Sequence, residues 1–319
     1  MYKEEILAEL AERYERNISW NLEKVIKPVL TKRERAELQD VRLQYPLIGR
    51  GGDPFRYFAT VEGKSRIIEM PVLSVKFLDD LATAAAWLEI KGLSTETLPA
   101  YVSMLKYQDI ERFPGGRYPT PLEALLPADR RHEREVDELA QDLLKTNVVY
   151  ILSRELGSIH FSSPYTLKKA SWQPQQIGMK PWGQRSRQQD LVLQCDAFAL
   201  EIMRRIGVPP HRLTFYLSAQ AYWTRSRIDF DDDEEVYLSY WHNPPGYAMF
   251  PERLHQIADL MVWGKEDYAR QQDDKLTSTS QIEQAARKIF RLSYVLEKQS
   301  MQWEVKQKAL GQTIEDLRP

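Results

Sequence analysis

The chain has 319 residues, a formal net charge of -2 and a sequence pI near 6.3. This balance of charge gives no general electrostatic basis for binding nucleic acid or a membrane surface. The hydrophobic fraction of 43% and the charged fraction of 28% are typical of a soluble globular protein with one large domain or two modest ones.

The sequence also carries signals about the compartment. The opening, Met1 to Glu5, is charged and has no apolar stretch of the kind that a signal peptide needs. The longest apolar runs, 81–88 and 147–152, are shorter than the roughly 20 residues of a membrane-spanning helix. A single cysteine, Cys195, excludes an internal disulfide framework. We therefore expect a cytoplasmic protein without membrane contact.

The first third of the chain predicts short helices followed by strands. Apolar residues at helical spacing predict a helix over 2–15, and a second over 20–26 that ends near Pro28. A third helix, over 32–38, has Thr31 as its predicted N-cap. From Val41 onward the apolar residues alternate, which predicts a strand and then a hairpin. The strand covers 41–45, and the hairpin is formed by 55–61 and 65–70.

The rest of the chain is predicted to be helical. A helix over 75–91 has Ser74 as its expected N-cap and Gly92 just past its end. The helix over 134–160 is apolar on nearly all sides in its second half, so we expect it to be the buried central helix. Further helices are predicted over 98–107, 191–206, 211–223, 250–263 and 278–310. The last of these has near-heptad spacing, and we favour docking on its own domain over pairing with a partner.

These elements predict a mostly helical α+β fold, with a small N-terminal strand hairpin packed together with helices on a helical domain. A proline-rich segment, which includes Pro114 and ends at Pro127, marks the expected boundary between the two portions. We divide the chain into a helical arm, an α+β portion, a helical domain and a long C-terminal helix. These cover residues 1–40, 41–127, 128–265 and 266–319.

Residues 162–190 form an irregular segment that is rich in Ser, Pro, Gln and Trp. Its basic residues and the aromatic residues Trp172 and Trp182 are a pattern that can stack on single-stranded nucleic acid. The five basic residues stand against a single acid, Asp190; they are Lys168, Lys169, Lys180, Arg185 and Arg187. Because this charge density is modest, we favour a lid-like or disordered loop. Binding to nucleic acid stays a weak alternative.

Residues 154–158, with the sequence Arg-Glu-Leu-Gly-Ser, have the outline of an H-E-x-x-H motif whose histidines are replaced. In that motif two histidines on one helix face bind zinc, and the glutamate polarises the attacking water. Residues 192–199 resemble E-x-x-A-D-x-x-A, and His242 to Pro245 with Glu252-Arg253-Leu254 resemble H-P-P…E-R-[IL]. In this order the segments resemble the zincin metallopeptidases, in particular the Lit-type phage-exclusion peptidases, over about residues 41–265.

The resemblance assigns the three zinc-ligand positions to Arg154, Ser158 and Val192. An arginine cannot coordinate a metal and repels it, a serine is a poor neutral ligand, and a valine has no ligand atom. Because zinc sites need three protein ligands, we expect no metal here. Glu155 is then a vestigial general-base position, and Asp196 and His242 are the supporting residues of the same resemblance. We also hypothesise that Arg154 neutralises Glu155 or Asp196 in place of a metal ion.

The expected function is that of a catalytically inactive, metallopeptidase-like protein that acts as a binding or regulatory module for a protein partner. A role in phage defence or stress response is implied by the resemblance alone. Two alternatives remain open. One is an active zinc metallopeptidase whose ligands are displaced, for example to Cys195 and His242, or supplied by a partner chain. The other is a structural scaffold subunit that assembles through its terminal helices.

Two further patterns are interpreted as structural. The acidic run 229–235 lacks the spacing of a calcium loop, which favours a solvated helix N-terminus. His160 stands five residues beyond Glu155, too far around a straight helix to share a site with it. We expect His160 at the C-terminal end of its helix, where a histidine is favoured electrostatically.

Overall fold

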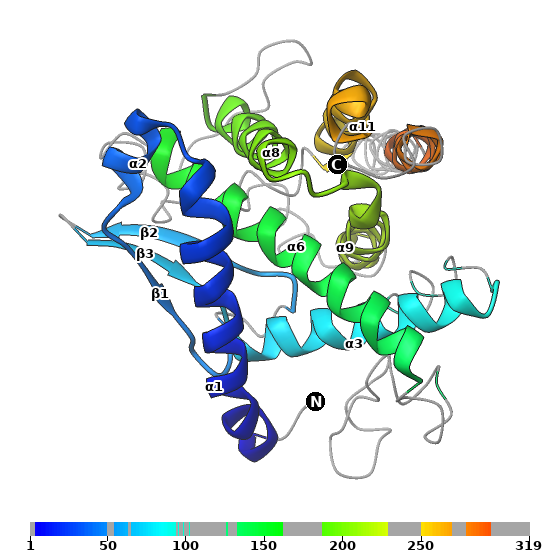
Figure 1. The fold of residues 1–319 in the computed structure, drawn as a ribbon, viewed down its shortest axis with the longest axis horizontal. Helices are drawn as coiled ribbons and strands as arrows, with labels where there is room; N and C mark the ends of the chain where they lie inside the picture. The colour runs from blue at the N-terminus through cyan, green and yellow to red at the C-terminus, as the bar shows by residue number, and fades with distance from the viewer. Residues whose placement is uncertain are drawn as a thin grey trace, which may run out of the picture.

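The computed structural model describes residues 4–49, 54–62, 65–93, 133–161, 187–228, 250–269 and 279–294, with the single residues 95, 98, 102 and 126. These residues form a mostly helical α+β fold in which a small sheet lies on one side of a helical assembly (Figure 1). This confirms the predicted fold class. In these ranges no helix is both long enough and apolar enough to cross a membrane.

The N-terminal segment is one continuous helical stretch where the sequence predicts two helices. Helix α1 (Glu4–Trp20) continues into a π-helical turn, η1 (Asn21–Ile26), and a 3₁₀ turn, η2 (Lys27–Val29). The two are joined because Trp20 keeps helical dihedral angles, φ -60 and ψ -44. Helix α2 (Lys32–Leu38) begins at Thr31 as predicted. Its capping box pairs the Glu34 N–H with Thr31 Oγ1 (3.3 Å) and the Thr31 N–H with Glu34 Oε2 (2.7 Å).

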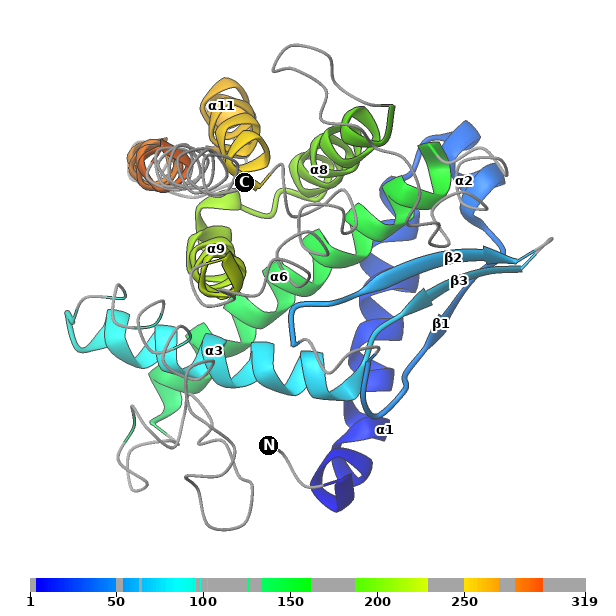
Figure 2. The ribbon, with the colours of Figure 1, turned by 180° about the vertical axis from the view of Figure 1, so that it is seen from behind.

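The sheet has three strands, β1 (Val41–Gln44), β2 (Phe58–Glu62) and β3 (Ser65–Glu69), in the order β1-β3-β2. Strands β2 and β3 are antiparallel, which confirms the predicted hairpin, and β1 runs parallel to β3. The parallel pairing follows from the long connection between β1 and β2, because a parallel strand cannot be reached by a tight turn. Strand β2 contacts the central helix, so the sheet covers part of it (Figures 1 and 2).

Helix α3 (Val72–Ile90) begins earlier than predicted, and the expected cap at Ser74 is wrong. The first helical N–H groups donate instead to main-chain carbonyls that follow β1: Val72 N–H to Pro46 (2.9 Å) and Leu73 N–H to Leu47 (3.0 Å). These carbonyls satisfy donors that a side-chain cap otherwise serves. At the other end Gly92 has φ +65, a left-handed conformation that suits glycine and confirms the predicted stop.

The longest helix, α6 (Arg134–Phe161), lies at the centre of the fold, as predicted (Figure 1). Around it lie α3, α8 (Arg187–Ile206), η6 (Pro210–Leu213) with α9 (Thr214–Ile228), and the sheet (Figure 2). Helix α11 (Phe250–Ala269) packs on α8, and a helix over 279–294 lies beside α11. The predicted helices in these ranges are confirmed, although α8, α9 and α11 each extend beyond the predicted bounds.

One cluster of buried apolar side chains connects these elements, from Leu7 on α1 to Ile289 on the helix 279–294. The four predicted portions therefore contribute to a common core. Several predictions concern positions outside the described residues and remain predictions: the helix over 98–107, most of the segment 162–190, the acidic run 229–235, His242 and residues 295–310.

Candidate functional site

The site around Glu155 depends on a close approach of α6 and α8. A Cβ atom added at Gly157 would lie 3.2 Å from Cys195 Cα and 3.2 Å from Phe198 Cδ1. Because glycine has no Cβ, the two helices can approach at this level. The approach brings two α6 side chains, Tyr150 and Arg154, to Asp196 on α8.

Asp196 is the centre of the site and is fully buried, with 0% of its surface exposed. Its Oδ1 accepts hydrogen bonds from the Tyr150 hydroxyl (2.9 Å), Arg154 Nε (3.0 Å) and Arg253 Nη2 (3.0 Å). Its Oδ2 accepts a short bond from Arg253 Nε (2.6 Å). The paired donation by Arg253, which comes from α11, fixes both the position and the charge of this carboxylate.

Arg154 joins Asp196 to the neighbouring acid. Its Nη1 donates to Glu155 Oε1 at 2.7 Å while its Nε donates to Asp196 Oδ1 at 3.0 Å. The predicted contact between Arg154 and these acids is therefore present, and it includes both of them. We call Tyr150, Arg154, Glu155, Asp196 and Arg253 the charge cluster. When both acids are ionised, the two guanidinium groups balance the two carboxylates.

Burial and ion pairing act in opposite directions on the two acids of the charge cluster. Burial by itself raises the pKa of Asp196, but Arg253 and Arg154 outweigh it and hold that pKa below its usual range. For Glu155 burial prevails over the attraction of Arg154, and its pKa is raised. The pKa of the Tyr150 hydroxyl is raised as well, by burial and by the charge of Asp196. Asp196 is thus a stable anion, whereas the charged form of Glu155 is disfavoured.

The raised pKa of Glu155 predicts a pH-dependent stability. A carboxyl group with a folded pKa above its unfolded value destabilises the folded state as the pH rises from the unfolded pKa, about 4.3 for Glu, through the folded one. We expect Glu155→Gln to remove this loss. The free energy of unfolding of the variant, minus that of the wild type, should therefore increase from pH 4 to neutral pH. Urea unfolding at several pH values measures the difference, with Glu9→Gln, an exposed site on α1, as control. Parallel pH profiles for Glu155→Gln and the wild type would contradict the expectation.

The positions that the resemblance assigns to zinc ligands do not fit a metal ion. Ser158 is half-buried on α6, and Val192 is buried on α8 without a coordinating atom. The place beside Glu155 and Asp196 is filled by the Arg154 guanidinium. In the described ranges no three His, Cys, Asp or Glu side chains are grouped so that they could hold a metal ion.

The other candidate ligands are Cys195, which adjoins Asp196 on α8, and histidines on α6 and α11. Cys195 is buried, which raises the pKa of its thiol to about 12 and makes it a neutral, apolar neighbour at pH 7. His160 lies in the last turn of α6, as predicted, with Nδ1 2.6 Å from Glu37 Oε2 and its ring stacked on Phe198. His255 lies on α11 near Asp259, 3.4 Å away.

Two members of the charge cluster, Tyr150 and Arg253, were not predicted as site residues. Tyr150 was interpreted as part of the apolar core, and Arg253 only as part of a motif. A signal for Arg253 is present in the sequence: it shares one helix face with Ile257 and Met261, which are spaced by four residues and buried. A charged residue in a buried apolar stripe indicates an ion pair with another element.

Comparison of the chain with protein-family models, with curated proteins and with solved structures gave no match.

Proposed function

We propose that the protein is a catalytically silent binding or regulatory module, with sequence motifs that resemble those of a zinc peptidase. The observation that carries this proposal is the position of the Arg154 guanidinium, within hydrogen-bond distance of both Glu155 and Asp196. A permanent cation at this position supplies positive charge to the two acids and offers no vacant coordination site to a substrate.

The state of Glu155 supports the same proposal. A general base must reach a water molecule and the reacting group, within about 2.6–3.2 Å of the proton that it takes up. Glu155 is only 5% exposed, and its Oε1 is engaged by Arg154. The Glu155 side chain therefore serves as a partner of Arg154 inside the packed helices and not as a base that meets a substrate.

The proposed partner is a protein, and a role in phage defence or stress response is proposed on the sequence resemblance alone. In a binding module the partner contacts the surface of the fold, and the charge cluster keeps α6, α8 and α11 in register beneath that surface. In an active peptidase, by contrast, the Glu155 carboxylate would act on a substrate.

The test is the metal content of the protein, purified without chelator after expression with added zinc, together with hydrolysis of an unstructured protein such as casein. We expect no near-stoichiometric zinc and no hydrolysis above that of the Glu155→Gln control, which has lost the candidate base. Near-stoichiometric zinc, or casein hydrolysis that Glu155→Gln abolishes, would instead favour the active metallopeptidase with displaced or partner-supplied ligands.

A specific observation favours a scaffold subunit as a second candidate. Two large aromatic side chains are exposed on neighbouring helices, Trp263 on α11 (81%) and Tyr294 on the helix 279–294 (61%). Exposed aromatic residues are enriched in protein interfaces. If the chain assembles through these helices, light scattering after size exclusion shows a mass above 37.4 kDa that the pair Trp263→Ser and Tyr294→Ser reduces. A monomer at all concentrations would reject self-assembly through this surface.

A further inference from the structure

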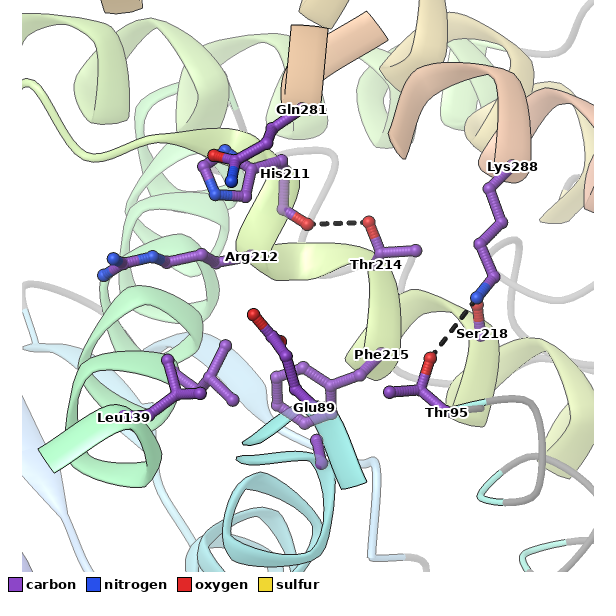
Figure 3. A pocket seen from close by; sticks show the side chains of 12 residues that line it. Glu89, Thr95, Leu139, His211, Arg212, Thr214, Phe215, Ser218, Gln281 and Lys288 are labelled. Atoms are coloured by element: carbon purple, nitrogen blue, oxygen red, sulfur yellow. Dashed lines mark hydrogen bonds between the residues drawn. The ribbon is translucent and has the colours of Figure 1, made fainter. Parts of the chain in front are cut away.

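A second site, separate from the charge cluster, is a cavity of about 190 Å³ (Figure 3). It is lined by residues of α3, α6, η6 with the start of α9, and the helix 279–294, together with Thr95. None of the five residues of the charge cluster lines it. Pockets for drug-sized ligands are typically about 300–1,000 Å³, so an occupant of this cavity is smaller than a drug-sized molecule.

Two opposite charges enter the cavity from different elements (Figure 3). Glu89, at the end of α3, is an exposed residue whose carboxylate points into the space, so it lies where the cavity meets solvent. Within the described part of the chain this carboxylate has no hydrogen bond or ion pair. Lys288 approaches from the helix 279–294, and its Nζ makes one long bond, 3.4 Å, to Thr95 Oγ1. An ammonium group has three donors, so Lys288 keeps donors for a ligand.

The remaining cation at the cavity is already balanced. Arg212 forms an ion pair with Asp142 on α6. The unbalanced charges of the lining are therefore one carboxylate, Glu89, and one ammonium group, Lys288. A cavity with one free charge of each sign favours a ligand that also carries one of each, since an ion of either sign would be attracted by one wall and repelled by the other.

One neutral polar group in the same lining, on His211, also lacks a partner among the described residues. Burial, assisted by the neighbouring Arg212, lowers the pKa of His211 to about 4, so its ring is neutral at pH 7. Its Nδ1 is buried and, among the described residues, without a hydrogen-bond partner. Gln281, an exposed residue, also lines the cavity (Figure 3). Because an unsatisfied buried polar group costs free energy, a ligand that bonds to His211 Nδ1 gains affinity.

The cavity also has an apolar wall, made by Leu139 and Leu143 on α6 and Phe215 on α9. From the cavity's size, its two free charges, the unpartnered His211 Nδ1 and this wall, we propose that it binds a small zwitterion of the α-amino-acid class with an apolar side chain. The ligand ammonium group pairs with Glu89 and the ligand carboxylate with Lys288. The apolar side chain contacts Leu139, Leu143 and Phe215.

Calorimetric titration of the full-length protein with L-leucine and L-phenylalanine tests this proposal. Two analogues separate the charges: N-acetyl-L-leucine lacks the ammonium group, and L-leucinamide lacks the carboxylate. We expect saturable binding of at least one amino acid, with affinity for both analogues lower by about tenfold or more, equivalent to about 1.4 kcal/mol. Failure of both amino acids to bind, or equal binding of an analogue, would overturn the proposal.

Variants test the assigned residues. Glu89→Gln and Lys288→Gln each remove one free charge and are expected to weaken amino-acid binding by about tenfold or more. The matched controls are Glu9→Gln on α1 and Arg291→Gln, an exposed neighbour of Lys288 on the same helix, and both should bind as the wild type does. Thermal unfolding without ligand verifies that all four variants are folded. Unchanged affinity in Glu89→Gln and Lys288→Gln would refute the assignment, whatever the metal content of the protein.

Discussion

Replacing Asp196 by Asn lowers the free energy of unfolding by about 3–5 kcal/mol, because it leaves two guanidinium groups without their shared anion. Arg253 is almost fully buried and donates to Asp196 through two nitrogens, and Arg154 donates a third bond. An uncompensated buried charge is among the few defects that reach this magnitude in a single substitution.

Urea unfolding of Asp196→Asn against the wild type measures this effect at neutral pH. Tyr150→Phe is the matched control, since it removes one hydrogen bond to the same carboxylate and leaves the charges in place. The control should cost about 1 kcal/mol. A loss in Asp196→Asn no larger than that in Tyr150→Phe would show that the ion pairs contribute little.

The same carboxylate gives the expected effect a pH dependence. Its folded pKa lies below the ordinary value, so its contribution is present above the unfolded pKa, about 3.9, and disappears as the pH falls through the folded pKa. The difference between the wild type and Asp196→Asn should therefore be constant near neutral pH and shrink only below about pH 4.

Replacing Gly157 by Val is the second large expected effect, a loss of about 1–3 kcal/mol or more in the free energy of unfolding. The added Cβ would meet the main chain of Cys195 at 3.2 Å, and a main-chain atom cannot rotate away as a side chain can. The helices α6 and α8 must separate, which also lengthens the bonds from Arg154 and Tyr150 to Asp196.

Ser158→Val controls for the intrinsic cost of a β-branched residue in α6, because Ser158 is the next residue and is only half-buried. Thermal or urea unfolding of both variants gives the comparison. Equal stability of Gly157→Val and Ser158→Val would mean that the close approach of the helices does not constrain this position.

Much of the fold was predictable because its elements are encoded locally. The strand over 41–44, the hairpin, the central helix and the cap at Thr31 follow from periodicity and from side chains within a few residues. The start of α3 was not predictable in this way. Its first donors bond to carbonyls of Pro46 and Leu47, more than twenty residues away in sequence, and no side-chain pattern indicates such a contact.

The candidate site likewise has residues that local sequence patterns indicate and residues that only the packing of the helices shows. The contact of Arg154 with Glu155 and Asp196 was anticipated because two motif-like segments, 154–158 and 192–199, assigned these residues to one site. Tyr150 and Arg253 reach Asp196 from 46 and 57 residues away, and only the packing of three helices shows that they share one partner. The cavity draws Glu89 and Lys288 from segments about two hundred residues apart, so local patterns carried no signal for it.

The start of α3 has a consequence for how this protein tolerates sequence change. Every residue, proline included, has a main-chain carbonyl. The hydrogen bonds that Pro46 and Leu47 accept therefore survive almost any substitution at those two positions. Helix α2, by contrast, depends on the hydroxyl of Thr31, which a single mutation can remove. The joint between the sheet and α3 is thus robust to mutational drift, and the sequence at 46–47 can diverge while the geometry of that joint persists.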